Sequence, residues 1–130
     1  MKKKSFFIDI DGVLYGKNVP DSGGPEALAY LREYGHRFLL VTNTSRMSQK
    51  QIANKLINHG YEIDLDEIFP VSLAAVDYLN IHLPASRCFL IGDRSLGNLL
   101  ETHGFSIFTS EQDADVVIIG QCKWPSFSDI

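Results

Sequence analysis

Two carboxylates spaced one residue apart follow an apolar segment near the start of the chain. Residues 5–14 read Ser-Phe-Phe-Ile-Asp-Ile-Asp-Gly-Val-Leu. A strand expected over 5–10 therefore carries Asp9 near its end and is followed directly by Asp11 and Gly12. Side chains at i and i+2 of a strand point to the same side. Asp9 and Asp11 should therefore emerge together at the carboxyl end of the strand, where open α/β sheets bind their ligands.

Two interpretations fit these carboxylates. Neighbouring carboxylates repel each other unless a cation lies between them, and Mg²⁺ is a hard cation that prefers oxygen ligands. Alternatively, Asp11 and Gly12 form an ordinary Asp-Gly turn that ends the strand. The motif alone does not separate a metal site from a turn.

Composition excludes several classes of protein. The chain has 130 residues, 45% of them hydrophobic and 22% charged, which is ordinary for one soluble domain. A net charge of −4 argues against nucleic acid as the main partner. No apolar stretch is long enough for a membrane span, and Asp9 interrupts the apolar segment after the basic run at 2–4, so no secretory signal is expected. Cys88 and Cys122 are too few for a disulfide framework or a zinc site, and we expect a cytoplasmic protein.

Strand and helix signals alternate along the chain, which predicts an α/β fold with parallel strands. A Pro at a helix start and a Gly after a helix end are typical boundary signals, and they bracket the segment 25–34 and recur at Gly60 and Gly104. The expected strands are 5–10, 37–42, 68–71, 87–91, 105–108 and 116–119, and the expected helices are 25–34, the segment between Ser48 and Gly60, 72–81 and 96–103.

Polar side chains also follow the second expected strand. Thr42, Asn43 and Ser45 come directly after an apolar run, and hydroxyl, amide and main-chain N–H groups at a strand end can donate to a phosphate. Such residues are also common loop formers. Their position about thirty residues after the paired carboxylates favours a phosphate site.

With these motifs in place, the chain resembles the haloacid dehalogenase (HAD) superfamily, and more narrowly its capped p-nitrophenyl-phosphatase-like subclass IIA. The resemblance covers nearly the whole chain and rests on Phe-Ile-Asp-Ile-Asp-Gly-Val-Leu (7–14), Gly-Pro-Glu-Ala-Leu (24–28), Val-Thr-Asn-Thr-Ser (41–45), Leu-Ile-Gly (90–92) and Ala-Asp-Val-Val-Ile-Ile-Gly (114–120). It implies a HAD-like doubly wound parallel sheet. Residues 1–84 would form the first half of the core domain, and residues 85–130 the first part of an α/β cap domain.

The resemblance also implies roles for the site residues. Asp9 would be the nucleophile that forms an aspartyl-phosphate, and Asp11 the general acid and then the general base. Mg²⁺ would bind the Asp9 carboxylate and the Asp11 main-chain carbonyl. Thr42 and Asn43 would bind the phosphoryl oxygens together with Gly12, which lets the backbone turn tightly beside the metal.

The chain departs from the family pattern near its end. The family has a lysine and a Gly-Asp motif after the cap, and neither has a convincing counterpart here, so we expect a truncated chain. Asp93 is expected to be a helix-entry residue rather than a replacement metal ligand. Lys50 and Lys55 are expected to be solvated, and the four histidines, which lie near helix ends, are expected to have no catalytic role: His36, His59, His82 and His103.

Three functions follow from this pattern. The first is a Mg²⁺-dependent phosphatase that hydrolyses a small-molecule phosphomonoester through an aspartyl-phosphate. The second is an inactive truncated fragment or interaction module that lacks the later motifs. A phosphotransfer receiver is a third, but receivers keep the acceptor aspartate on a later strand. Half a parallel sheet leaves an unpaired edge, so we also hypothesise a homo-oligomer.

Overall fold

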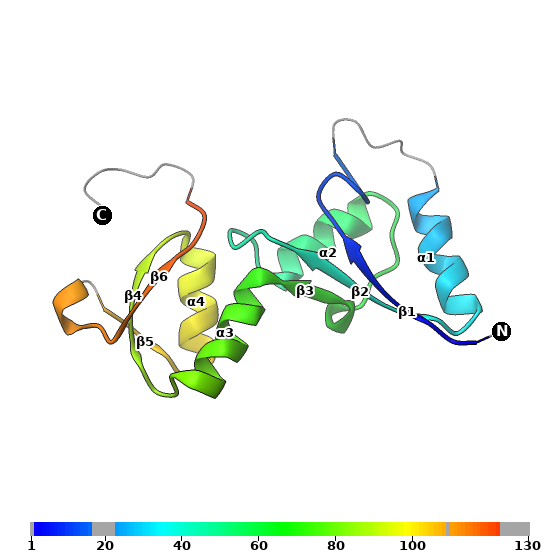
Figure 1. Ribbon diagram of the computed structural model, residues 1–130. Helices are drawn as coiled ribbons and strands as arrows, with labels where there is room; N and C mark the ends of the chain where they lie inside the picture. The colour runs from blue at the N-terminus through cyan, green and yellow to red at the C-terminus, as the bar shows by residue number, and fades with distance from the viewer. Residues whose placement is uncertain (1, 17–22, 109, 123–130) are drawn as a thin grey trace. The chain divides into compact units, whose positions relative to one another are not determined.

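The computed structural model describes residues 2–16, 23–108 and 110–122. Strands and helices alternate along the chain (Figure 1), in the order β1 (Ser5–Asp9), α1 (Gly24–Glu33), β2 (Arg37–Thr42), α2 (Gln49–Asn58), β3 (Ile68–Pro70), α3 (Val71–His82), β4 (Arg87–Ile91), α4 (Arg94–Thr102), β5 (Ser106–Phe108) and β6 (Val116–Ile119), with short 3-10 turns at Leu65–Glu67 and Glu111–Asp113. The described residues form two compact units: Met1–Thr42 with Gln49–Pro70, and Asn43–Ser48 with Val71–Ile130.

The first unit is built on a parallel sheet with the strand order β1-β2-β3. In the register of β1 and β2, Asp9 lies opposite Val41, and the Ile10 N–H extends the ladder to the Val41 carbonyl at 3.1 Å. Leu40 in β2 and Ile68 in β3 are almost completely buried, as expected for strands that helices cover. The carboxyl ends of β1 and β2 are therefore held side by side.

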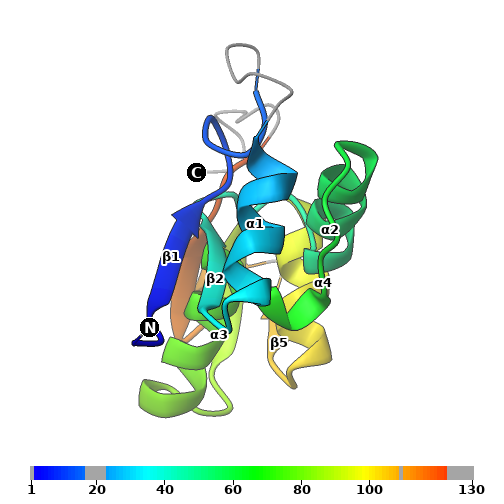
Figure 2. The same ribbon diagram turned by 90° about the vertical axis from the view of Figure 1, so that its right-hand side faces the viewer.

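Two helices complete the first unit, and Figure 2 shows α1 beside β2. Pro25 lies in the first turn of α1, where its missing N–H costs nothing. Gly35 follows α1 with a φ of +67°, a left-handed conformation that ends the helix. Leu28 of α1 and Leu56 of α2 are buried at 2% and 0% exposure, so each helix turns an apolar face inward.

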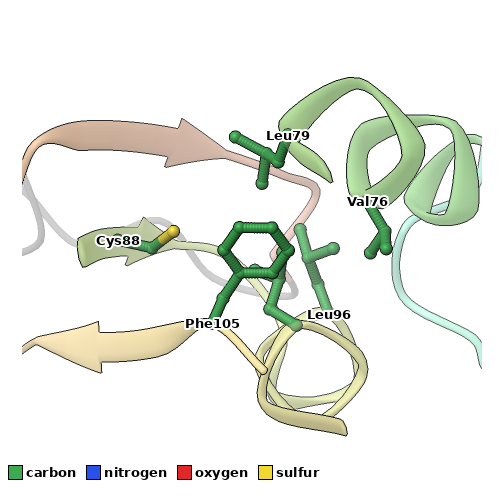
Figure 3. Close-up of a cluster of buried hydrophobic side chains, with 6 residues drawn as sticks. Val76, Leu79, Cys88, Leu96 and Phe105 are labelled. Atoms are coloured by element: carbon green, nitrogen blue, oxygen red, sulfur yellow. The ribbon is translucent and has the colours of Figure 1, made fainter. Parts of the chain in front are cut away.

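The second unit repeats the plan with a parallel sheet in the order β5-β4-β6. Helices α3 and α4 pack with this sheet around a buried apolar cluster, which Figure 3 shows in close-up. Phe105 is 4% exposed and Cys88 0%, so this cysteine is a small buried hydrophobe, while Cys122 is half-buried. The cluster comprises Val76, Leu79, Cys88, Leu96, Leu100 and Phe105.

The prediction of an α/β fold with parallel strands is confirmed. The strands expected at 37–42, 87–91 and 116–119 have those bounds in the structure, and the other elements differ by one or two residues at an end. The helix expected to begin at Ser72 begins one residue earlier, at Val71, so Ser72 lies inside α3. Parts of the segment between the first expected strand and the first expected helix, and of the tail after Gly120, lie outside the described residues.

The expected division at residues 84 and 85 differs from the place where the compact units part. Helix α3 belongs with the second sheet, so the second unit takes up the chain again at Val71. The assignment of the units to a core and a cap remains a prediction. In the part of the chain that the structure describes, the helices are too short or too polar to cross a bilayer.

Candidate functional site

The paired carboxylates lie at the carboxyl end of β1. Asp9 is the last residue of the strand, and Asp11 follows two positions later. Both are exposed, whereas Ile10 between them is completely buried. This alternation places Asp9 and Asp11 on the side away from the apolar interior, as the strand period requires.

A hydrogen bond joins the ends of β1 and β2. The Thr42 hydroxyl donates to the Asp11 carboxylate, with Oγ1 2.9 Å from Oδ2, although the two residues are 31 positions apart. Thr42 is 6% exposed, so its rotamer is fixed by the packing around it. The structure therefore brings together Asp11 and Thr42, two of the residues that the sequence places in one site.

The chain turns sharply after Asp11. Gly12 has a φ of +85°, a left-handed conformation that favours glycine, and its N–H donates to the Tyr15 carbonyl at 2.8 Å. The Val13 and Leu14 N–H groups both donate to the Ile10 carbonyl. The tight turn expected at Gly12 is thus present, and it carries Tyr15 back toward Asp11.

Tyr15 lies against Asp11 and was not expected in the site. Its side chain is 6% exposed. Burial, the nearby Asp11 charge and a hydrogen bond to Asp11 raise the pKa of Tyr15 to about 12. The neutral phenol is therefore held beside the Asp11 carboxylate.

Two cationic or titratable side chains surround the Tyr15 ring. The Lys55 ammonium nitrogen lies 3.9 Å from the ring centroid, and the His59 ring stacks on Tyr15 with centroids 5.3 Å apart. Lys55 was expected to be solvated but is half-buried. Lys55 and His59 are spaced four residues apart and so share one side of α2 and its exit. Their spacing predicts that Lys55 and His59 lie close to each other, but nothing in the sequence identifies Tyr15 as their common neighbour.

Asn43 follows Thr42 directly but belongs by its contacts to the second unit. It is exposed, and the loop 43–48 that it begins is bonded to the end of β6. The Gln121 N–H donates to Ser45 Oγ at 2.8 Å, and the Ser45 N–H donates to Gln121 Oε1 at 3.3 Å. The position of Asn43 relative to the carboxylates, and its role as a phosphate ligand, remain predictions.

The residues at the end of β1 offer oxygen ligands of the kind that Mg²⁺ prefers. The Asp9 carboxylate is exposed, and among the described residues no main-chain N–H outside the regular elements donates to the Asp11 carbonyl. The described residues contain no cluster of three or more His, Cys, Asp or Glu side chains suited to a metal. Asp9 and the Asp11 carbonyl thus fit a Mg²⁺ that keeps several waters.

The remaining polar residues have structural partners. Asp93 caps α4 by accepting from the Ser95 N–H at 3.0 Å, which confirms its helix-entry role. His59 and His103 each place Nδ1 2.8 Å from the carbonyl four residues earlier, as expected near helix ends. His59 also stacks on Tyr15, a contact that the sequence does not predict.

With the parallel sheets and the strand-end carboxylates established, comparison with known families gives a clear result. The model of the haloacid dehalogenase-like hydrolase family matches residues 6–106. The chain belongs to this family, so the expectation drawn from the motifs is confirmed.

Individual relatives agree with this assignment. The chain is 35% identical over 112 residues to phosphoglycolate phosphatase 1A, chloroplastic, of Arabidopsis thaliana, covering 85% of this chain and 31% of the relative. A p-nitrophenyl phosphatase structure from Archaeoglobus fulgidus matches with a TM-score of 0.85 and 28% identity, covering 99% of this chain and 49% of that one. A glycerol phosphate phosphatase structure from Mycobacterium tuberculosis, in complex with magnesium, matches with a TM-score of 0.84 and 25% identity, covering 96% and 38%. The chain spans less than half of the length of the curated relatives it matches.

Proposed function

We propose that the protein is a Mg²⁺-dependent phosphatase that hydrolyses a small-molecule phosphomonoester through an aspartyl-phosphate. The observation that carries the proposal is the 2.9 Å hydrogen bond from Thr42 to Asp11 at the adjoining ends of two parallel strands. The bond fixes the Asp11 carboxylate at the carboxyl end of β1, beside the exposed Asp9. Ligands of α/β sheets bind at such strand ends. Membership of the HAD-like hydrolase family supports this chemistry.

Asp9 would act as the nucleophile. A carboxylate oxygen of Asp9 attacks phosphorus, the bond to the ester oxygen breaks, and an aspartyl-phosphate forms. The exposure of Asp9 leaves this oxygen open to an incoming ester. Water then attacks the same phosphorus, releasing inorganic phosphate and restoring the Asp9 carboxylate.

Asp11 would move the protons. In the first step its carboxylic acid protonates the leaving oxygen, and in the second its carboxylate takes a proton from the attacking water. The Thr42 hydroxyl holds one carboxylate oxygen, Oδ2, at a fixed place. Asp11 is thus held in place for proton transfer, with Tyr15 hydrogen-bonded to the same carboxylate.

Thr42, Asn43 and Gly12 would bind the phosphoryl oxygens, and Asp9 with the Asp11 carbonyl would hold the Mg²⁺. The cation would neutralise charge on the phosphoryl group during transfer. The magnesium complex of the Mycobacterium tuberculosis relative supports this cofactor. A cytoplasmic location, with the cysteines reduced, remains part of the proposal.

An inactive fragment or interaction module is the second candidate. This candidate is favoured because the chain covers 49% or less of the length of the two related structures above. Strand β1 lies at the edge of its sheet, and its Phe7 is 77% exposed, as expected if another segment or a second copy covers that face.

Turnover of p-nitrophenyl phosphate with Mg²⁺ separates the two candidates. The 130-residue chain should release p-nitrophenol, and Asp9→Asn should lower kcat by at least about a thousandfold. Asp66→Asn, on an exposed residue of the 3-10 turn before β3, is the matched control and should retain the rate. A cooperatively folded chain that turns over no ester would support the inactive module, and equal rates for the chain and Asp9→Asn would remove Asp9 as the nucleophile.

A further inference from the structure

Two hydroxyl groups hold the Asp11 carboxylate from different parts of the chain. The Thr42 hydroxyl donates to Oδ2 at 2.9 Å, and the Tyr15 hydroxyl donates to the same carboxylate. Asp11 is exposed, and an exposed aspartate that binds only water moves rapidly among its staggered rotamers. Because two protein donors restrict this motion, the place of the Asp11 carboxyl depends on the place of the Tyr15 ring.

The main chain brings Tyr15 to Asp11 but does not set the direction of its ring. The Gly12 N–H donates to the Tyr15 carbonyl at 2.8 Å, and Asp11 and Tyr15 form an isolated β-bridge. The Tyr61 hydroxyl donates to the Leu14 carbonyl at 2.6 Å, which anchors the same turn to the segment after α2. These contacts fix the path of the turn, so the direction of the Tyr15 side chain is set by what packs on its ring.

The end of α2 supplies the contacts on that ring, and all of these residues belong to the first unit. The Lys55 ammonium nitrogen lies 3.9 Å from the Tyr15 ring centroid, well within the roughly 6 Å reach of cation–π attraction. The His59 ring stacks on Tyr15 with 27° between the planes, and its Nδ1 lies 2.8 Å from the Lys55 carbonyl. Tyr15 is 6% exposed, so its ring has little room to turn away from these contacts.

The position of Lys55 differs from that of an ordinary surface lysine. Such a lysine extends its ammonium group into water, whereas Lys55 is half-buried with its ammonium group over the Tyr15 ring. A hydrogen bond to an ionised carboxylate is stronger than a neutral one. Cation–π attraction on the ring face and the hydrogen bond to Asp11 at the hydroxyl therefore favour the same orientation of Tyr15.

We propose that Lys55 and Tyr15 are positioning residues: Lys55 orients the Tyr15 ring, and the Tyr15 hydroxyl keeps the Asp11 carboxyl in the one rotamer from which it transfers protons. The use of this rotamer in proton transfer rests on the proposed function, whereas the rotamer itself is a property of the folded chain. Both residues act through Asp11 rather than on the substrate.

The rotamer of Asp11 can be measured without any substrate. Tyr15→Phe keeps the ring and removes the hydroxyl, and Lys55→Met keeps the length of the side chain and removes its charge. The three-bond Hα–Hβ couplings of Asp11, measured by NMR, should show one χ1 rotamer in the wild-type chain and averaging among rotamers in both variants. Lys55→Arg keeps a cation on the ring and should retain the one rotamer. Lys50→Met, on an exposed lysine of the same helix, is the matched control and should leave the couplings unchanged.

A comparison of two leaving groups tests proton transfer separately from folding. Phenol is a poorer leaving group than p-nitrophenol, so its departure depends more on protonation by Asp11. In Tyr15→Phe, kcat/KM should fall about tenfold for phenyl phosphate and about twofold for p-nitrophenyl phosphate. In Lys55→Met, kcat/KM for phenyl phosphate should fall about threefold, and that for p-nitrophenyl phosphate should stay within about 1.5-fold. A smaller fraction of folded chain would instead lower both values by the same factor.

The outcomes separate this proposal from the proposed function. Averaged Asp11 couplings in the wild-type chain, or couplings that Tyr15→Phe leaves unchanged, would overturn the positioning even if phosphatase activity is present. Equal falls of the two kcat/KM values would overturn its link to proton transfer, and an effect of Tyr15→Phe that Lys55→Met does not share would overturn the role of Lys55. If the wild-type chain turns over neither ester, loss of the one rotamer in both variants would support the positioning and count against the proposed catalysis.

Discussion

Ser45 and Gln121, 76 residues apart, each bind the main chain of the other. Ser45 Oγ accepts from the Gln121 N–H at 2.8 Å, and Gln121 Oε1 accepts from the Ser45 N–H at 3.3 Å. The Thr44 hydroxyl donates to the same Oε1 at 3.3 Å. Because Asn43 begins this loop, the pair fixes the segment that carries a proposed phosphate ligand.

Removal of either side chain should destabilise the second unit. Ser45→Ala leaves the Gln121 N–H without its acceptor, and we expect the free energy of unfolding to fall by about 1–2 kcal/mol. Gln121→Ala should cost about 0.5–1 kcal/mol, since the bonds it removes are longer and more exposed. Urea denaturation measures both changes.

Ser106→Ala is the matched control for this pair, because Ser106 is an exposed serine in β5 of the same unit. Its effect should stay within about 0.5 kcal/mol. A Ser45→Ala variant as stable as this control would show that the pair does not hold the loop.

The bond from Thr42 to Asp11 should appear as a coupling energy between the two residues. Thr42→Val keeps the shape of the side chain but removes the donor, and with Asp11→Ala it completes a double-mutant cycle. We expect about 1 kcal/mol of coupling, because Asp11 is exposed and water competes for its carboxylate. Thr42→Ser keeps the hydroxyl, so Asp11→Ala should cost nearly as much stability in the Thr42→Ser chain as in the wild type, and more than in the Thr42→Val chain. Equal costs of Asp11→Ala in the Ser and Val chains would contradict the contact.

Tyr15 should titrate late while the chain is folded. Its pKa of about 12 means that one phenol ionises well above the ordinary value of 10 while the chain is folded. The raised value favours the neutral form in the folded state. The resulting stabilisation is complete below pH 10 and is lost as the pH rises through 12.

Tyrosinate absorbance measured against pH checks this value. Tyr15→Phe should remove the phase near pH 12, and Tyr78→Phe, on an exposed tyrosine, should leave that phase in place. A late phase that persists in Tyr15→Phe would assign it to another residue.

Much of the fold could be predicted because its signals are local. The unbroken apolar run ending at Thr42 gave β2 with its observed bounds, and Gly35 and Gly60 ended helices through positive φ values. The helix start at Val71 was missed by one residue, because Ser72 carries a cap signal but lies buried inside α3.

The candidate site was predictable only in part, for a geometric reason. Asp9 and Asp11 are identified by their spacing on one strand, and Thr42 by its place at the end of the next. Tyr15 reaches Asp11 through the local turn at Gly12, whose path the residue types alone do not show, whereas the contact of Lys55 with Tyr15 depends on the approach of α2, which is tertiary packing. The place where the compact units part, at Val71, also depends on tertiary packing, since nothing local shows which sheet α3 covers.

Arg87 and Asp115 offer a test of electrostatics at the ends of the second sheet. The Arg87 guanidinium and main-chain N–H both donate to Asp115, and these bonds lower the pKa of Asp115 to about 2. A lowered pKa stabilises the folded state above pH 3.8, the ordinary value, and this contribution is lost as the pH falls from there through 2.

Arg87→Gln should raise the Asp115 pKa part of the way to 3.8, because the main-chain bond remains. Carbon-13 NMR of the carboxyl group measures the value directly. Arg94→Gln, on an exposed arginine of α4, is the control; if Asp115 still titrated near 2 in Arg87→Gln, the guanidinium would not be the cause.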